Sequence, residues 1–155
     1  MSEQALTGVR ILDFSQVLAG PFATQLMAQL GAQVIKVEQP VGGDMTRGLM
    51  STSSDGMAPS FLAANLGKRS LTLDLKNPKA KEIVHKLVAE ADVIVENFKP
   101  GTIERLGFGF EAMKAIKPDL VYASISGFGQ TGPRANLPAF DGAIQAYSGM
   151  MSISG

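Results

Sequence analysis

The sequence predicts an α/β protein built on a doubly wound parallel sheet, and three features support this prediction. Five short apolar runs of strand length alternate with helix-like segments along the 155 residues. The opening segment reads as strand, loop, helix and strand, which is how a parallel sheet begins. Glycine, proline and asparagine mark the junctions between these segments. We therefore expect a doubly wound parallel sheet within one domain.

The opening unit covers residues 9–40. Residues 9–14 form an apolar run of strand length, a helix is predicted between Gly20-Pro21 and Gly31, and residues 34–37 supply the second strand. Residues 15–19 are then a loop at the carboxyl edge of the sheet. Ligands of open α/β sheets bind outside this edge, where exposed amides can meet anionic groups.

A nicotinamide-binding site is disfavoured at this loop. Glu38 ends the second strand, where such enzymes keep the acid that binds ribose. A pyrophosphate-binding turn, however, needs three glycines at G-x-G-x-x-G spacing, and the loop SQVLAGP supplies only Gly20.

A long polar stretch, residues 41–59, follows the opening unit and contains GGDMTRG and STSSDG, with Arg47 as its only cation. Connections of this length are usually functional or disordered. A short helix is predicted over residues 60–66 and ends at Gly67, and the alternation of SLTLDL predicts a strand over residues 70–75.

Asn77-Pro78 predicts a helix start, because asparagine caps free amides and proline suits the first helical position. His85, the only histidine, lies off the apolar stripe of this helix and is interpreted as a solvated residue. The stripe itself consists of apolar residues at helical spacing: Ala80, Ile83, Val84, Leu87, Val88 and Ala91.

The remaining strands are predicted over residues 92–96 and 120–126, and each leads into a loop at the carboxyl edge. Short helices are predicted from Thr102 and over residues 110–116 between these strands. After the loop GFGQTGP, a further helix covers residues 142–148. The last segment, residues 148–155, has no regular structure in this interpretation. Met57, Met150 and Met151 lie in irregular segments and are interpreted as gap-filling core.

Composition narrows the classes of function. The chain has no cysteine, which excludes disulfides and thiolate metal sites. Fourteen basic residues balance fourteen acidic ones, so no net field favours nucleic acid or an anionic membrane. No signal peptide and no apolar run of membrane-spanning length is recognised, and a cytoplasmic location is expected.

The side chains expected at the carboxyl edge include many hydrogen-bond donors and cations but few nucleophiles. Because the chain has no cysteine and its one histidine is expected on a helix surface, catalytic serine or cysteine triads that use histidine are not available. Zinc sites that use histidine are excluded for the same reason, and no metal is expected. Five cations would suit a phosphorylated ligand lying across the edge, although each could also be a solvated surface charge. These cations are Lys68, Arg69, Lys76, Lys99 and Arg105; the full edge set is Gln16, Leu18, Asn97, Lys99, Arg105, Gln130, Phe140 and Asp141. Asp141 could instead cap the amides of the helix that it begins.

Six ordered motifs are similar to those of the class III CoA-transferases, which include formyl-CoA and carnitine CoA-transferases and, as a relative, α-methylacyl-CoA racemase. The motifs span nearly the whole chain: VRILDFSQVLAGPFATQLMAQLGAQVIKVEQP, GGDMTR, GKRSLTLDLK, ADVIVENFKPGTIERLG, ASISGFGQTGP and PAFD. The resemblance implies a Rossmann-like large domain split around a smaller domain, in two subunits interlocked like links of a chain. Family members are much longer. Residues 1–155 therefore correspond to the N-terminal part of the large domain, without the small domain and the C-terminal return.

The resemblance also implies the chemistry. An aspartate attacks the CoA thioester, forms a mixed anhydride and releases CoA, which is then transferred to an acceptor carboxylic acid. That aspartate would lie beyond Gly155, so we expect no catalytic residue in this chain. The CoA-binding positions implied by the resemblance are Gln16, Leu18, Ala19, Gln39, Leu73, Asp74, Leu75, Lys76, Asn97, Phe98, Lys99, Arg105, Leu137, Pro138, Ala139 and Phe140.

Three positions depart from relatives of known chemistry. Gln39 stands where formyl-CoA transferase has an arginine on the nucleotide, and Leu18 and Phe140 replace its glutamine and tyrosine, which argues against formyl or oxalate specificity. Racemase relatives carry an acid/base histidine at the position of Phe140, and phenylalanine cannot move a proton. A transferase is therefore favoured. A racemase-like enzyme and a non-catalytic CoA-binding or assembly module are the alternatives.

Overall fold

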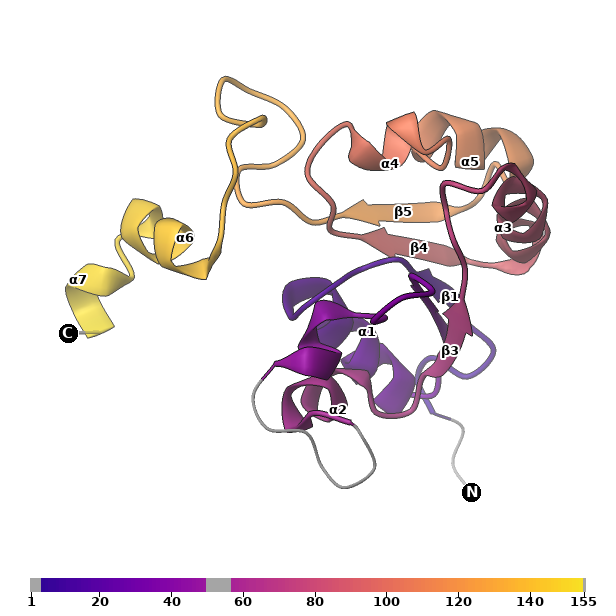
Figure 1. Ribbon diagram of the computed structural model, residues 1–155, viewed down its shortest axis with the longest axis horizontal. Helices are drawn as coiled ribbons and strands as arrows, with labels where there is room; N and C mark the ends of the chain where they lie inside the picture. The colour runs from indigo at the N-terminus through magenta and orange to yellow at the C-terminus, as the bar shows by residue number, and fades with distance from the viewer. Residues whose placement is uncertain (1–3, 50–56, 155) are drawn as a thin grey trace.

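The computed structural model describes residues 4–49 and 57–154, which form a single five-stranded sheet with helices on both faces and a C-terminal arm (Figure 1). In chain order the elements are β1 (Arg10–Asp13), α1 (Ala19–Gln29), β2 (Gln33–Glu38), the 3-10 helix η1 (Met45–Gly48), α2 (Pro59–Asn65), β3 (Arg69–Thr72), α3 (Pro78–Glu90), β4 (Val93–Glu96), α4 (Thr102–Arg105), α5 (Phe110–Ile116), β5 (Val121–Ser124), α6 (Asp141–Ser148) and α7 (Met151–Ser154).

The strand order is β3-β2-β1-β4-β5, and every neighbouring pair is parallel. The chain winds outward from β1 in one direction through β2 and β3, and in the other direction through β4 and β5. This arrangement confirms the predicted doubly wound sheet. The winding reverses between β1 and β4, and ligands of such sheets bind at this switch point beyond the carboxyl ends of the strands.

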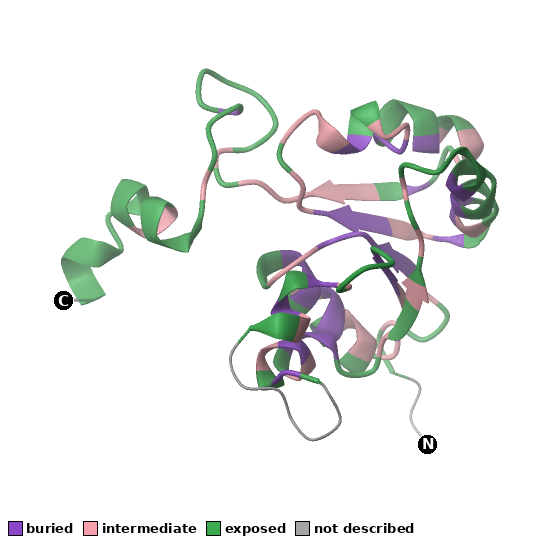
Figure 2. Cartoon of the chain, viewed as in Figure 1, coloured by how far each residue is buried: buried purple, intermediate pink, exposed green. Residues whose placement is uncertain are grey.

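Helices α1 and α2 cover one face of the sheet, and α3, α4 and α5 cover the other (Figure 1). Alternate residues of β1 supply the two cores because successive side chains of a strand point to opposite faces. Ile11 packs with Val34 and Val95 on the α1 side, while Leu12 packs in the larger cluster around Val84. Buried residues are concentrated in the sheet and on the helix surfaces that face it (Figure 2).

Helix α3 begins as its sequence predicts. Asn77 accepts a hydrogen bond from the Lys79 amide at 3.0 Å, and Pro78 occupies the first turn. His85 is exposed, as expected, but Ile83 is 43% exposed and does not belong to the buried stripe. The buried face of α3 is therefore narrower than predicted: Ala80, Val84 and Val88 are buried, and Leu87 is partly buried.

The C-terminal arm, residues 127–154, extends away from the sheet (Figure 1). Its last segment was predicted to be irregular, but residues 151–154 form α7, so that prediction is wrong. The interpretation of Met57, Met150 and Met151 as core is also wrong, since all three are more than one-third exposed. Among the residues that the structure describes, the fully buried methionine is Met113, on α5.

No helix in residues 4–49 or 57–154 combines the length and apolar character needed to cross a bilayer.

The contrast between two methionines tests this description of the core. Met113→Ala removes a fully buried side chain and should lower the free energy of unfolding by about 2–5 kcal/mol. Met150→Ala removes a side chain that is 51% exposed and should change it by less than about 0.5 kcal/mol. Equilibrium denaturation with urea measures both values. Equal effects of the two substitutions would contradict this assignment of the core.

Candidate functional site

The loops that follow β1 and β4 meet at the switch point of the sheet. The Gln16 amide donates a hydrogen bond to Asn97 Oδ1, and Asn97 Nδ2 donates one to the Gln16 carbonyl, both at 2.7 Å. The Asn97 side chain thus bonds both peptide groups of Gln16, as a neighbouring strand would. This pair brings together two predicted site residues that are 81 positions apart in the sequence.

The backbone of this loop is strained. Val17 has φ of 67°, a left-handed conformation that is unfavourable for a β-branched residue. The Val17 amide donates to both carboxylate oxygens of Asp44, at 3.3 and 3.2 Å. The carbonyl of Ser15, two residues before Val17, accepts a hydrogen bond from Lys36 Nζ at 2.7 Å. These contacts offset the strain and hold the loop in place.

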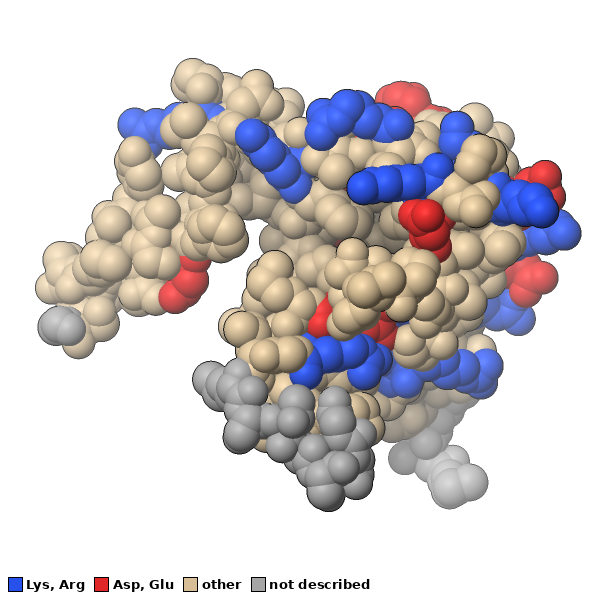
Figure 3. Space-filling view, viewed as in Figure 1, with Lys and Arg blue, Asp and Glu red and all other residues tan. Residues whose placement is uncertain are grey.

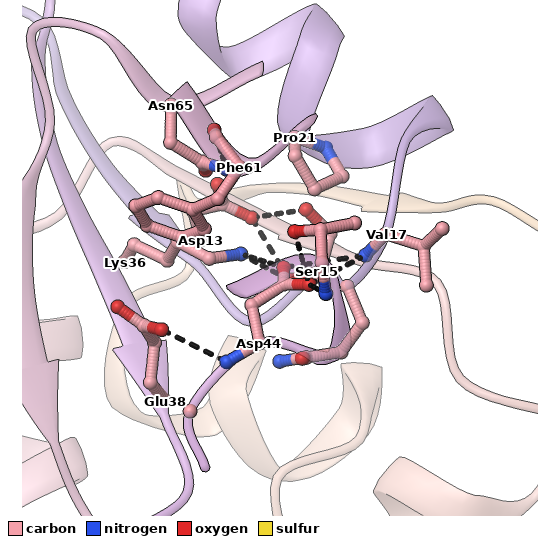
Figure 4. A network of polar contacts seen from close by, with 12 residues as sticks. Asp13, Ser15, Val17, Pro21, Lys36, Glu38, Asp44, Phe61 and Asn65 are labelled. Carbon is pink, nitrogen blue, oxygen red and sulfur yellow. Dashed lines mark hydrogen bonds and ion pairs between the residues drawn. The ribbon is translucent and has the colours of Figure 1, made fainter. Parts of the chain in front are cut away.

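Two buried ion pairs lie directly beneath the loop (Figure 4). Lys36 Nζ lies 2.8 Å from Asp44 Oδ2, and Lys68 Nζ lies 3.0 Å from Asp13 Oδ2, with every one of these side chains at most 2% exposed. Asp13 also accepts hydrogen bonds from Thr24 Oγ1 at 2.6 Å and from the Ser15 hydroxyl. Removing one member of such a pair would leave an uncompensated buried charge, so each partner requires the other.

A third carboxylate, Glu38, connects this cluster to the polar stretch after β2. Arg47 donates two hydrogen bonds to Glu38, at 2.7 and 2.8 Å, and its guanidinium stacks 3.7 Å above the Phe61 ring. Burial alone would raise the pKa of Glu38, but the hydrogen bonds from Arg47, Ser70 and the Asp44 amide outweigh it and lower the pKa to about 2. Glu38 is fully engaged and does not present a free carboxylate to a ribose.

The described part of the polar stretch, residues 41–49, is therefore an ordered structural connection. Asp44 caps η1 by accepting from the Thr46 amide at 2.9 Å, and the pKa of Asp44 is lowered because hydrogen bonds from Lys36 and Thr46 outweigh the effect of burial. Residues 50–56, which include all of STSSDG, lie outside the described residues.

A cleft of about 610 Å³ opens at the carboxyl edge beside these loops. We call it the rim cleft; it is lined by Gln16, Val37, Glu38, Gln39, Pro40, Val41, Met45, Leu73, Asp74, Leu75, Lys76, Phe98 and Leu106. Its wall is mainly apolar, and Lys76 is an exposed cation at its margin. Seven of the predicted CoA-binding positions lie in this one cleft.

A second pocket of about 760 Å³ lies on the α4 side of the same edge. This α4 pocket is lined by Pro100, Gly101, Glu104, Arg105, Phe110, Tyr122, Ser124, Gln130 and Asn136. Arg105 and Gln130 of the predicted edge set thus lie here and not in the rim cleft. Lys99 is exposed on the turn between the two pockets. Across the face drawn in Figure 3, basic side chains are spread out and do not form one continuous patch.

The buried Glu96 orders the turn that separates the pockets. Its carboxylate accepts a hydrogen bond from the Phe98 amide at 2.9 Å. Burial raises the pKa of Glu96, and hydrogen bonds from Ser124 and Phe98 offset this effect only in part.

Lys68 and Arg69, two of the five predicted edge cations, line neither the rim cleft nor the α4 pocket, and for them the prediction is wrong. Lys68 is buried against Asp13, and burial lowers its pKa despite that partner. Arg69 is the first residue of β3 and lines a pocket with Arg10 and Gln33, the first residues of β1 and β2.

Gln130 and Asn136 of the C-terminal arm line the α4 pocket, but the predicted positions 137–140 line neither pocket. Leu137 and Phe140 are 47% and 85% exposed, and Pro138 and Ala139 lie between them. Asp141 begins α6 but does not cap its amides; its carboxylate accepts from Gln145 Nε2. Leu18 and Ala19 are exposed on the β1 loop, and Leu18 is 62% exposed.

The residues that hold the loop, Asp13, Lys36 and Asp44, were not predicted. A signal for two of them was present, because a charged residue stands inside each of the apolar strand runs VRILDF and VIKV. A charge at such a position is almost never buried without a partner. Among the residues that the structure describes, no three histidine, aspartate or glutamate side chains gather where they could hold a metal ion.

Comparison with known proteins identifies the family. The sequence model of CoA-transferase family III matches residues 6–155. The chain belongs to this family. It is 46% identical to a succinate–glutarate CoA-transferase of Agrobacterium fabrum over 97% of its length, and 47% identical to a formyl-CoA:oxalate CoA-transferase of Bradyrhizobium diazoefficiens over 98%.

Solved structures of the family share the fold. A CAIB/BAIF family protein from Brucella suis matches 99% of the chain with a TM-score of 0.92 and 43% identity, and a Mycobacterium tuberculosis protein matches all of it with a TM-score of 0.89 and 39% identity. The chain spans 39% and 36% of the two curated relatives, and 42% and 43% of the two solved chains.

The Glu38–Arg47 pair makes stability depend on pH. Because the pKa of Glu38 falls from its ordinary 4.5 to about 2 on folding, its ionisation stabilises the fold above pH 4.5. This contribution, about 3 kcal/mol, is lost as pH falls from 4.5 towards 2. The difference in free energy of unfolding between the wild type and Glu38→Gln should therefore be largest at neutral pH and shrink in acid. Urea denaturation at a series of pH values measures it.

The matched control is Glu82→Gln, which removes an exposed carboxylate on α3. Its difference from the wild type should stay small throughout. A Glu38→Gln difference that is the same at pH 3 and pH 7 would show that the ion pair does not lower the pKa in this way.

Proposed function

We propose that this chain binds an acyl-CoA at the carboxyl edge of its sheet, as part of an enzyme that transfers CoA to an acceptor carboxylic acid. The observation that carries the proposal is the rim cleft at the switch point, beside the joined loops of Gln16 and Asn97, in a chain of CoA-transferase family III. The relatives that match it include transferases named for succinate, glutarate, formyl-CoA and oxalate.

The lining of the rim cleft suits the carrier. CoA has a flat base, a long uncharged pantetheine arm and phosphate groups, so its site needs apolar walls and cations at the rim. Leu73, Leu75 and Phe98 supply apolar surface, and Lys76 lies where it could meet a phosphate. In this proposal Gln39 and Asp74 contribute polar contacts at the cleft margin.

Two further cations complete the proposed phosphate path. Lys99 and Arg105 are exposed, and neither forms an ion pair within residues 4–49 and 57–154. Arg105 Nη2 donates to Thr102 Oγ1 at 2.9 Å, which directs the guanidinium along α4 and leaves its other donors for a ligand.

We propose that the attacking carboxylate is supplied by polypeptide other than residues 1–155. In the transfer, that carboxylate would attack the thioester carbonyl to form a mixed anhydride and release the CoA thiolate. The acceptor carboxylate would then attack the protein-derived carbonyl of this anhydride and displace the donor carboxylate. The thiolate would attack the acyl carbon of the resulting acceptor anhydride, which forms the new CoA thioester and regenerates the attacking carboxylate. The role of this chain is to hold the carrier so that its thioester lies beside the β1 loop.

The exposed C-terminal arm supports association with further polypeptide. Phe140, Tyr147 and Ile153 are 85%, 61% and 82% exposed, and surfaces of this kind mark interaction sites. We propose that they are covered in an interlocked homodimer, where Leu137–Phe140 would approach an active site. Phenylalanine at position 140 supports a transferase over a racemase, because it cannot exchange a proton with substrate.

Removal of the Arg105 guanidinium tests the phosphate path. Arg105→Ala should raise the dissociation constant for CoA by about 3- to 30-fold, because one charge-assisted hydrogen bond at an exposed site is lost. Isothermal titration calorimetry with free CoA measures the change. Arg10→Ala is the matched control, since Arg10 is an exposed arginine at the opposite edge of the sheet, and it should leave the affinity unchanged.

The 155-residue polypeptide by itself should bind CoA without transferring it. Incubation with succinyl-CoA and glutarate, followed by chromatography of the CoA esters, should detect no exchange. Exchange by this polypeptide alone would contradict the proposed location of the nucleophile. Absence of CoA binding would contradict the proposed role of the rim cleft.

A further inference from the structure

We propose that Lys36 and Asp44 are positioning residues: their buried ion pair holds residues 15–17 in the backbone conformation that places Gln16 against the rim cleft. The inference deepens the proposed function and rests on it for the identity of the ligand. The geometry of the loop itself is independent of that identity.

The loop is held by side chains. Five backbone groups of residues 15–17 form hydrogen bonds, and each bond goes to a side chain outside these three residues. The Ser15 amide donates to Asp13 at 2.9 Å, the Ser15 carbonyl accepts from Lys36 at 2.7 Å, both peptide groups of Gln16 bond to Asn97 at 2.7 Å, and the Val17 amide donates to Asp44 at 3.2 and 3.3 Å. The conformation of the loop therefore depends on where these side chains are fixed.

Lys36 and Asp44 bond the peptide groups on the two sides of Gln16, directly before the strained residue Val17. Lys36 Nζ bonds the Ser15 carbonyl and Asp44 Oδ2, so one ammonium group links the loop to the segment before η1. Val17 follows with φ of 67°, and its amide is directed at the Asp44 carboxylate. Without this acceptor the amide would be left unpaired, and a β-branched residue would have no compensation for a left-handed conformation.

Asp44 is itself held rigidly. Its amide donates to Glu38 Oε2 at 2.9 Å, and its Oδ1 accepts from the amide and hydroxyl of Thr46 at 2.9 and 2.8 Å. Glu38 ends β2, and Lys36 lies within the same strand. The Lys36–Asp44 ion pair therefore fixes the loop that follows β1 relative to β2 (Figure 4). The carboxylate cannot turn away from Val17 without breaking several hydrogen bonds.

Stability alone does not explain the pair. A buried ion pair is often no more stabilising than apolar residues of the same size, because both charges lose their hydration. An apolar pair at positions 36 and 44 could fill the same space, but it could not accept from the Val17 amide or donate to the Ser15 carbonyl. The charges of Lys36 and Asp44 are therefore explained by the backbone geometry of residues 15–17, which an apolar pair could not maintain.

The test separates loop geometry from stability with the double variant Lys36→Met/Asp44→Leu. It removes both charges together, so that no buried charge is left unpaired. The matched control is Lys117→Met/Asp92→Leu, which removes another lysine–aspartate pair, 3.2 Å apart at the amino edge of the sheet. Thermal melting, amide hydrogen exchange by NMR and titration with free CoA are measured for each variant and for the wild type.

In the double variant the Gln16 and Val17 amides should exchange about tenfold faster or more, because their acceptors are lost or displaced. The amides of Leu12 and Ile94, inside the sheet, should change by less than about twofold. The control should leave all four amides unchanged. The inference would be overturned if the Gln16 and Val17 amides of the double variant exchanged at the wild-type rate. It would also be overturned if their exchange accelerated no more than that of the sheet amides.

Asp44→Asn provides a second variant if the double variant does not fold. It keeps the shape of the side chain and one acceptor oxygen, and it should accelerate exchange at Val17 while the sheet amides remain protected. Wild-type exchange at Val17 in this variant, with the neutral side chain in place, would also overturn the proposed role of the charge.

Titration with CoA distinguishes this inference from the proposed function. In the wild type the Gln16 amide resonance should shift on addition of CoA, and this shift should be reduced in the double variant. If no resonance of the wild type responds to CoA, the proposed function fails, and the exchange rates still decide whether the ion pair positions the loop. If CoA binds equally well to the double variant and shifts Gln16 as before, the positioning role fails and the CoA site stands.

Discussion

The buried contact between Lys36 and Asp44 is the interaction on which the rest of the site depends. It places two charges in the interior, where each is tolerated only in the presence of the other. The same two side chains bond the backbone of the β1 loop, and the β1 loop bonds Asn97 after β4. One polar cluster thus links β2, β1 and β4 at the switch point of the sheet, where open α/β sheets bind their ligands.

The three ion pairs around this point are built in the same way: a carboxylate at or after the end of a strand is paired with a cation from another segment. Asp13, Asp44 and Glu38 come from the ends of β1 and β2 or directly after them, and each is paired with a cation from a different segment: Lys68, Lys36 and Arg47. The carboxyl edge therefore contains a rigid polar layer beneath an exposed, mainly apolar cleft. Such an arrangement allows loops to carry a binding site without the mobility that loops usually have.

The core and the site depend on different physical effects. The cores on the two sheet faces consist of interchangeable apolar side chains whose contribution scales with buried area. The loop at the switch point depends on specific donors and acceptors, since a buried polar group without a partner is strongly unfavourable. Substitutions in the core should therefore act on stability, whereas substitutions in the polar layer should act on geometry as well.

The fold class, the five strands and the start of α3 were predictable from the sequence because they depend on local signals. Apolar periodicity identifies strands and helices, and Asn77-Pro78 and Gly31 mark helix ends through their own backbone chemistry. Family membership was also accessible, since ordered motifs survive in the linear sequence. The helical end of the arm was missed because residues 151–154 form only one short turn of helix, which carries too little periodicity to recognise.

Only the tertiary structure decided which charged residues face solvent and which lie in the interior. Lys68 and Lys76 are eight positions apart and equally basic, yet one is buried against Asp13 and the other is exposed at the rim cleft. The partner of Asp44 is Lys36 and the partner of Glu38 is Arg47, a crossed pairing that no spacing rule indicates. A side chain's partner is set by how strands and loops are brought together in space, and residues far apart in the sequence carry no local signal of that proximity.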